Sequence, residues 1–361
     1  MTILAAIIAL LLPAAPAAAK SGVEAMPFLK LDAGPRPASM GGAYCASGDD
    51  AVAVFYNPAS AGLVGRHEAY LGHNEWLEGM RVESGSYVHP HGYRLTFFGS
   101  LNALFSGAMR KYDALGTRLE DFDAREYALA GGAAYYLGAG FHFGAAVKLL
   151  NQSVGGSGGA GWAGDAGLLK KWDRWTAGAS VSNFGGKISV GSESFEVPLI
   201  LRAGAAFRPL DKVTIAGEGV KNGEAGFEGA LGGELALPSG AGQVFFIRAG
   251  LRSGRDENTG PGVSAGLGMR TGPLGLDYSF SPYGDLGGAH RLSLSFLFGA
   301  RRPPDLAKKP YAPARDARPY WSEEKPAPRS PSSRPADRPA SRPASKPAPK
   351  KEQKEEIFLL W

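Results

Sequence analysis

The sequence predicts an all-β protein: a transmembrane antiparallel β-barrel of about 14 strands, with an N-terminal hatch-like segment and a disordered C-terminal tail. Three observations carry this prediction. An apolar leader opens the chain, a series of short segments alternates apolar with polar residues, and glycine accounts for 52 of 361 residues. Because no Gly-X-Y period accompanies the glycine, closely spaced β-strands explain its abundance better than collagen does.

The leader is predicted to be a secretory signal over residues 1–19. The stretch from Ile3 to Ala19 is almost wholly apolar, Pro13 and Pro16 interrupt it, and a run of alanines precedes Lys20. A short apolar region that ends in small residues is typical of a signal that is cleaved after export. No Lys or Arg precedes the apolar run, so a retained anchor is the alternative.

The barrel is predicted over residues 66–299, where segments of roughly ten residues alternate large apolar with small or polar residues. In the segment from His290 to Phe298, one face carries Leu292, Leu294, Phe296 and Phe298, and the other carries Arg291, Ser293 and Ser295. One face suits lipid and the other suits water. A soluble β-sandwich is the alternative, but a sandwich buries its apolar face and normally leaves its charges on the surface.

Charged residues fall on a single face of these segments, opposite the large apolar residues. Arg248 and Arg252, for example, alternate with Ile247 and Leu251. Both signs of charge occur, which predicts a lumen laced with ion pairs. The lumen-facing charged candidates are Arg94, Glu126, Lys148, Asp165, Arg202, Glu218, Glu228, Glu234, Arg248 and Asp277.

The connections predict the orientation, because outer-membrane barrels have short periplasmic turns and longer outer loops. With the N-terminus in the periplasm, the short turns all face the periplasm; they are expected at His89-Pro90-His91-Gly92, Gly138, Asp173, Asp211-Lys212 and Gly272-Pro273. The longer links then face outward, and they are expected at Leu104 to Asp123, Gly155 to Ala160, Lys187 to Pro198 and Arg255 to Pro261. The first is the strongest candidate for a functional loop.

The tail, residues 300–361, is predicted to be disordered and periplasmic, because a Pro, Ala, Lys and Arg-rich segment cannot build a core. Residues 301–361 contain 15 Lys+Arg and 8 Asp+Glu, a net charge of +7. The whole chain has 39 Lys+Arg and 34 Asp+Glu, so the remainder has 24 basic and 26 acidic residues, a net charge of −2. The basic character therefore belongs to the tail, and no nucleic-acid partner is expected.

A family resemblance rests on motifs at both ends of the barrel region. The N-terminal motifs are Met40-Gly41-Gly42-Ala43-Tyr44, Asp49-Asp50-Ala51, Tyr56-Asn57-Pro58-Ala59 and Gly62-Leu63, and the C-terminal ones are Asp277-Tyr278, Pro282, Leu286-Gly287, His290-Arg291 and Phe298-Gly299. They resemble PorV/PorQ proteins of the FadL-like superfamily. The resemblance implies a hatch or plug over residues 20–65, with Met40, Gly41, Gly42, Asp49, Asp50, Asn57, Pro58 and Ala59 as its motif. Ser60, in place of the usual glycine, Pro35-Arg36-Pro37 and the long tail depart from the family pattern.

The resemblance implies a function as well. A PorV/PorQ protein is expected to act in type IX-like protein secretion or surface attachment, with secretion-system components or exported cargo as partners. The alternative is a FadL-like channel for uptake of hydrophobic small molecules. A structural envelope protein, tethered to peptidoglycan or a periplasmic protein through its basic tail, is the second alternative. Each places the chain in the bacterial outer membrane, with outer-membrane lipid and the barrel-assembly machinery as partners.

No catalytic or metal site is predicted. The sequence contains neither a Gly-x-Ser-x-Gly elbow nor a His-Glu-x-x-His helix, and its ionisable residues are dispersed along the strands. His89 and His91 flank a proline, which favours a turn over a metal site. We therefore expect a protein that is not an enzyme and that needs no cofactor.

Overall fold

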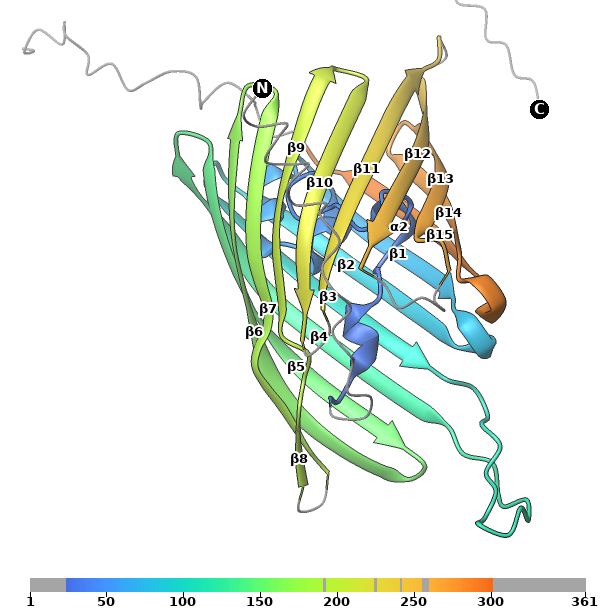
Figure 1. Cartoon of the computed structure of the whole chain (residues 1–361). Helices are drawn as coiled ribbons and strands as arrows, with labels where there is room; N and C mark the ends of the chain where they lie inside the picture. The colour runs from blue at the N-terminus through green and yellow to red at the C-terminus, as the bar shows by residue number, and fades with distance from the viewer. Residues whose placement is uncertain (1–23, 191–192, 224–225, 241, 255–259, 301–361) are drawn as a thin grey trace, which may run out of the picture. The chain divides into compact units, whose positions relative to one another are not determined.

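The computed structural model describes residues 24–190, 193–223, 226–240, 242–254 and 260–300. The predicted signal, and the predicted tail from residue 301 onward, lie outside these ranges. The described residues form a closed antiparallel β-barrel whose lumen is filled by the segment that precedes the first strand (Figure 1). None of the helices in the described ranges has the length and apolar character that crossing a bilayer requires.

The barrel wall has fourteen strands. The described residues contain fifteen strands, but the short strand β8 (Glu193–Glu196) pairs only with β7 among them, which leaves 15 − 1 = 14 in the wall. Each wall strand pairs with the next along the chain, and β1 pairs with β15 to close the ring. The predicted strand number and closure are thereby confirmed. The strands are β1 (His67–Glu75), β2 (Arg81–His91), β3 (Leu95–Phe105), β4 (Ala124–Gly138), β5 (Phe141–Val154), β6 (Ser157–Trp172), β7 (Trp175–Val190), β9 (Ile200–Leu210), β10 (Val213–Asn222), β11 (Phe227–Pro238), β12 (Gln243–Ser253), β13 (Val263–Thr271), β14 (Leu274–Pro282) and β15 (Gly288–Phe298).

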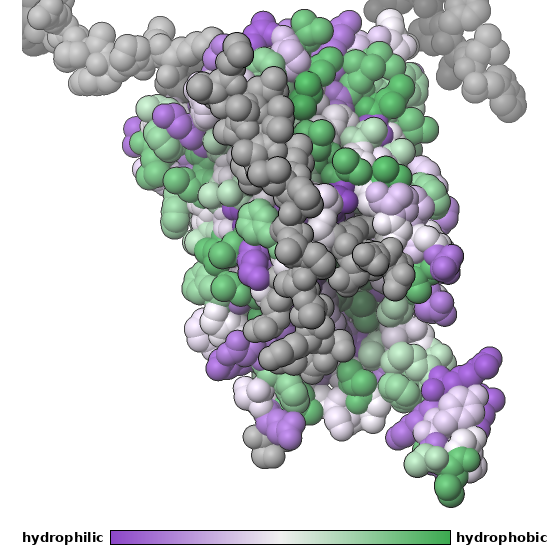
Figure 2. All heavy atoms as spheres, in the orientation of Figure 1, coloured by the Kyte–Doolittle hydropathy of each residue, from purple (hydrophilic) through white to green (hydrophobic). Residues whose placement is uncertain are grey.

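The outer surface of the wall is apolar because side chains alternate between the two faces of each strand. Along β15, Leu292, Leu294 and Phe296 point outward and are 57%, 43% and 43% exposed, whereas Arg291 and Ser293 point inward and are buried. Other strands repeat this pattern with Leu, Phe, Ile and Val outside. Figure 2 shows such hydrophobic residues along the flank of the barrel. A surface of this kind is stable only against an apolar medium such as lipid.

The two ends of the barrel differ in their connections, and we call them the short-turn end and the long-loop end. Tight turns join β2–β3, β4–β5, β6–β7, β9–β10, β11–β12 and β13–β14 at the short-turn end. At the long-loop end, the link between β3 and β4 projects as a hairpin-like arm, held by bridges from Met109 to Phe122 and from Tyr112 to Arg118 (Figure 1). In Figure 2 this projecting arm is mostly hydrophilic.

Three predicted connections need correction. Strand β6 begins at Ser157, so the link predicted to reach Ala160 is only a tight turn, because the glycines around it remain paired as strand. The link from Lys187 to Pro198 contains the end of β7 and strand β8. His89 and His91 lie in β2, and the turn that was expected there begins at Gly92.

The segment from Glu24 to Arg66 forms the hatch, and most of its residues are buried inside the barrel. It contains three short 3₁₀ helices, η1 (Pro27–Lys30), η2 (Ala51–Phe55) and η3 (Pro58–Leu63), and one α-helical turn, α2 (Pro35–Ser39). Helix α2 contacts β12, β13 and β14, η2 contacts β1, β2 and β3, and η3 contacts β3, β4, β5 and β6. The hatch therefore touches opposite sides of the wall.

Glycines in the wall allow the hatch backbone to approach closely, since glycine has no Cβ. A Cβ at Gly144 on β5 would overlap the backbone of Pro58, and one at Gly167 on β6 would overlap the side chain of Asn57. On the opposite side, a Cβ at Gly250 of β12 would overlap the backbone at Gly41. Inward-facing glycine thus makes room for the plug.

We predict that Leu294→Lys destabilises the barrel in lipid by about 2–4 kcal/mol, because it places a charge on the lipid-facing side near the middle of a strand. Urea unfolding in lipid vesicles measures the effect. Leu115→Lys is the control, because Leu115 lies in the projecting arm and is 91% exposed. Equal stability of the two variants would contradict the assignment of the lipid-facing surface.

We predict that Gly144→Ala displaces the hatch, because the added methyl group would collide with Pro58. Hydrogen exchange of residues 51–63 should accelerate. Gly131→Ala is the matched control: it adds the same methyl group to β4, where no atom lies within 4 Å of the new Cβ. If the two variants showed the same hydrogen-exchange rates over residues 51–63, the close packing of hatch and wall would be refuted.

Candidate functional site

The plugged lumen is the candidate functional site, and Arg36 of α2 is its central charge. Its Nε and Nη2 donate to the two carboxylate oxygens of Glu234 on β11, both at 2.8 Å. Its Nη1 donates to Asp49 and Asp50 of the hatch, both at 2.9 Å. Glu234 also accepts from Arg248 of β12 at 2.6 Å. Bidentate guanidinium–carboxylate pairs of this kind are strong and directional, so they fix the position of α2 against the wall.

A second ion pair ties the hatch to β12. Arg252 donates through Nη2 to both oxygens of Asp32, at 2.8 and 2.9 Å, and through Nε to the carbonyl of Gly41. The hydroxyl of Tyr56 donates to Asp32 as well. Burial alone would raise the pKa of Asp32, but the neighbouring guanidinium groups, Arg252 foremost, lower it to about 2. The pair therefore remains ionised at any ordinary pH.

Glu218 of β10 provides the third anchor. One of its oxygens accepts the backbone N–H groups of Tyr44 and Cys45, at 2.8 and 2.7 Å. The other accepts from Arg202 of β9 at 2.9 Å. A carboxylate that is buried needs such partners, because an uncompensated buried charge is costly. Glu218 thus links the hatch backbone to two wall strands.

The predicted hatch motif lies inside the barrel. Asn57 accepts the N–H of Ala59 and thereby caps η3, which begins at Pro58. Its side-chain amide donates to the carbonyls of Cys45 and Leu168, the latter on β6. The two residues after Met40 are Gly41 and Gly42, whose φ angles are 67° and 88°. Glycine adopts such positive φ angles readily. These residues shape the path of the hatch and connect it to the wall.

The structure places nine of the ten lumen-facing candidates on the inner side of the wall. Lys148 pairs with Asp165, Arg248 pairs with Asp277, Glu126 accepts from Gln152 and Glu228 accepts from Asn222. The prediction for Arg94 was wrong: it is exposed in the turn between β2 and β3, where strand alternation does not apply. Sequence reasoning missed the hatch partners Asp32 and Arg36, although Arg36 stands in the unusual Pro35-Arg36-Pro37.

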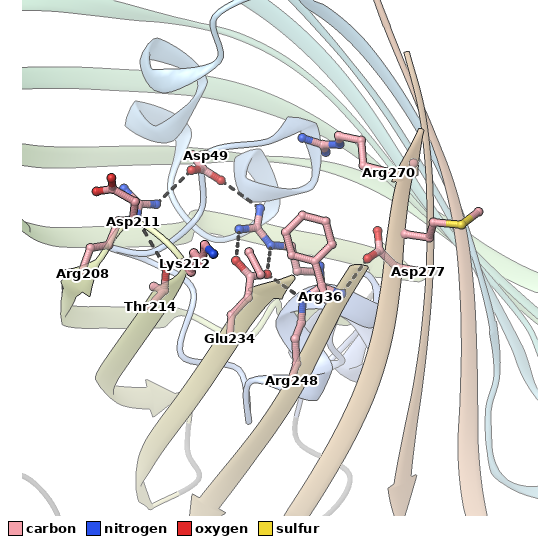
Figure 3. A pocket seen from close by; sticks show the side chains of 14 residues that line it. Arg36, Asp49, Arg208, Asp211, Lys212, Thr214, Glu234, Arg248, Arg270 and Asp277 are labelled. Carbon is pink, nitrogen blue, oxygen red and sulfur yellow. Dashed lines mark hydrogen bonds and ion pairs between the residues drawn. The ribbon is translucent and has the colours of Figure 1, made fainter. Parts of the chain in front are cut away.

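A charged pocket of about 190 Å³ opens beside the Arg36 network at the short-turn end (Figure 3). Side chains from the β9–β10 turn and from β10 to β14 line it together with Arg36 and Asp49 of the hatch. Its charged lining residues are Arg36, Asp49, Arg208, Asp211, Lys212, Glu234, Arg248, Arg270 and Asp277. Most of the lining of this pocket is therefore charged. Among the described residues, no group of three or more His, Cys, Asp or Glu is arranged to hold a metal ion.

A second cavity, of about 30 Å³, lies between the hatch and strands β3, β4, β5, β7 and β9. Its apolar lining comprises Leu29, Leu31, Ala33, Phe55, Ala128, Ala130 and Ile200. Its polar lining comprises Tyr56, Ser100, Asn102, Lys148, Ser182, Asn183 and Arg202. Half of its lining residues are polar, and we call it the apolar cavity after the side chains that the hatch contributes, four of which are Leu29, Leu31, Ala33 and Phe55. An adjacent buried cluster joins hatch residues Ala25, Met26 and Phe28 to wall residues Val82, Leu104, Ala128, Leu150, Ala163 and Ile188.

We predict that hatch docking weakens in acid because of Asp32. The pKa of its carboxyl is about 2 in the folded protein, below the value of about 3.9 expected when unfolded. The stabilisation, on the order of 2 kcal/mol, is therefore complete above pH ~4 and is lost as the pH falls toward 2. Protection factors from hydrogen exchange of residues 24–63 measure it. Asp32→Asn should weaken docking at neutral pH and flatten part of this pH dependence; an unchanged profile would contradict the role of the pair.

Comparison with known proteins identifies the fold. No family model and no curated sequence matches the chain. Among solved structures, the Ralstonia pickettii toluene transporter TbuX is similar with a TM-score of 0.53, 15% identity and coverage of 75% of this chain and 100% of that one. The P. putida toluene transporter TodX is similar with a TM-score of 0.50 and 14% identity, and the match covers 75% of this chain and 99% of that one. A Pseudomonas aeruginosa FadL homologue is similar with a TM-score of 0.50 and 13% identity, and the match covers 74% of this chain and 98% of that one. The chain therefore shares the fold of FadL-type channels, and the match spans nearly the whole length of each of these three solved proteins.

Proposed function

We propose that this protein is an outer-membrane channel for small, neutral, hydrophobic molecules. The observation that carries the proposal is the apolar cavity between hatch and wall, which adjoins a larger apolar cluster inside the barrel. The hatch side of this cavity is mainly apolar, formed by Leu29, Leu31 and Phe55. The similar structures named as toluene transporters support the same solute class.

The charges around the apolar cavity favour a neutral solute. Lys148 and Arg202 are the only cations among its lining residues, and each already pairs at 2.9 Å with a buried carboxylate, Asp165 or Glu218. A carboxylate solute would find no uncompensated positive charge there, and removing it from water is costly. An apolar solute with a small hydrogen-bonding group could instead use Ser100, Asn102 or Ser182.

The hatch closes this path in the structure. A cavity of about 30 Å³ accommodates water but not an aromatic molecule. Entry of solute therefore requires displacement of hatch side chains such as Leu29, Leu31 or Phe55. The ion pairs of Arg36, Asp32 and Glu218 hold the rest of the hatch during this movement.

The proposed location is the bacterial outer membrane, with the short-turn end and the tail in the periplasm. The apolar outer surface and the predicted signal support this location, and the short turns at one end support the orientation. Outer-membrane lipid and the barrel-assembly machinery are its expected partners. The PorV/PorQ resemblance, a role in protein secretion with its cargo, and tethering to peptidoglycan or a periplasmic protein through the tail stay predictions. The similar solved structures are channels, and they favour transport over secretion.

We predict that expression in intact cells that lack other hydrophobic channels raises the uptake of labelled toluene but not that of benzoate. Ala130→Leu should reduce toluene uptake several-fold, because it fills the apolar cavity from β4. Ala145→Leu is the control: it makes the same change on the outward face of β5. Wild-type uptake by the Ala130→Leu variant, or no uptake by the unaltered protein, would overturn the proposal.

A further inference from the structure

We propose that the charged pocket at the short-turn end is a binding site for a phosphate-type oxyanion, formed by Arg208, Lys212 and Arg270. This site is separate from the apolar cavity and does not depend on the channel function. The proposal rests on where these side chains come from, on the balance of charge among the lining residues, and on an unsatisfied donor.

The three cations come from two sides of the pocket. Arg208 lies near the end of β9, Lys212 lies in the β9–β10 turn, and Arg270 lies near the end of β13. Figure 3 shows Arg270 reaching across from one side of the pocket, with Arg208 and Lys212 on the other and Arg36 between them. Side chains that converge on one space from separate strands can contact a single small ligand together.

The charge balance leaves cations available. Five cations and four carboxylates line the pocket, a net charge of 5 − 4 = +1. Arg36 and Arg248 are occupied by Glu234, Asp277 and the hatch carboxylates, and Arg208 shares Asp49 with Arg36. Within the described part of the chain, Lys212 and Arg270 have no salt-bridge partner.

The nearby charges offset this small excess, because Asp50 also accepts from Arg36 and brings the count to five cations and five carboxylates. Asp211 is exposed in the same turn as Lys212. Lys171 of β6 adds a positive charge near Arg208, and Glu68 of β1 places a buried carboxyl group near Arg270. Glu68 forms no salt bridge with Arg270 in the described residues. The network as a whole is therefore close to neutral, and the positive charge next to the open space comes from Lys212 and Arg270, which form no salt bridge among the described residues.

Arg270 also has a donor without a partner. Its Nε is buried, and no hydrogen-bond acceptor in the described residues reaches it. An unsatisfied buried donor costs about 1–3 kcal/mol. An oxyanion that binds side-on to a guanidinium accepts from Nε and one terminal nitrogen at once, a geometry that phosphate fits well. Binding would supply the missing acceptor.

The size of the pocket limits the ligand. A cavity of about 190 Å³ admits a phosphate group with a few waters, or the phosphate of a lipid headgroup, but not a folded macromolecule. Thr214, whose hydroxyl accepts from Arg208 at 3.4 Å, adds a hydroxyl group to the lining. Free phosphate and a headgroup share this chemistry, and the experiment below separates them.

Isothermal titration of the purified full-length protein with inorganic phosphate, at constant ionic strength set with chloride, tests the site. We expect saturable binding that Arg270→Gln and Lys212→Gln each weaken about tenfold, a loss of about 1.4 kcal/mol. Lys187→Gln is the matched control, because it removes one positive charge at the long-loop end, where Lys187 pairs with Glu196. Equal binding by all four proteins, or equal weakening in all three variants, would show non-specific attraction and overturn the proposal.

Two further measurements identify the source of the anion and separate this site from the channel. Thermal stabilisation in phosphatidylglycerol nanodiscs that is lost in Arg270→Gln assigns the site to a lipid headgroup. Stabilisation by inorganic phosphate alone assigns it to a free anion, and no specific response to either contradicts the site. Ala130→Leu should leave phosphate binding unchanged, so failure of the channel proposal and failure of this one give different results.

Discussion

The bidentate pair between Arg36 and Glu234 is the interaction on which the arrangement of the lumen depends. Their side chains are 13% and 7% exposed, so both charges depend on ion-pair partners inside the barrel. Removal of Arg36 would leave Glu234 with Arg248 alone, and would leave the hatch carboxylates Asp49 and Asp50 without this partner, so the plug is expected to be destabilised. Because Glu234 also accepts from Arg248, and Arg248 donates to Asp277, the position of α2 is coupled to strands β11, β12 and β14. The plug and this part of the wall therefore form one electrostatic unit.

Close approaches to glycine hold the hatch on both sides, whereas ion pairs with the wall are concentrated on one side. Toward β9 to β14, the contacts are ion pairs and charge-assisted hydrogen bonds from Asp32, Arg36 and the Tyr44–Cys45 backbone. Toward β5 and β6, the contacts are close approaches of backbone to glycine, at Gly144 and Gly167. The apolar cavity lies between the hatch and β3 to β9, where few ion pairs tie the two together. The same division separates the region in which we propose that an apolar solute binds from the region that fixes the plug.

Much of the barrel could be predicted from the sequence, because a period of two residues decides which side chains face lipid. Leu292, Leu294 and Arg291 illustrate this: each lies on the face that alternation assigns. The same rule fails at Arg94, since a turn interrupts the alternation. Partners across the lumen could not be predicted. Arg36 and Glu234 are 198 positions apart, and their contact depends on the path of an irregular segment that has no period.

The closing seam between β1 and β15 has a consequence for the order of assembly. Every other neighbouring pair in the wall joins strands that are adjacent along the chain or separated only by β8, whereas His67 pairs with Phe298, 298 − 67 = 231 positions away. Closing so long a loop has the largest entropic cost of any pairing in the wall, so the seam is expected to form last. The hatch precedes β1, yet its ionic partners lie on β9 to β12. It can reach them while the sheet is still open, so closure of the ring would trap the plug already in place.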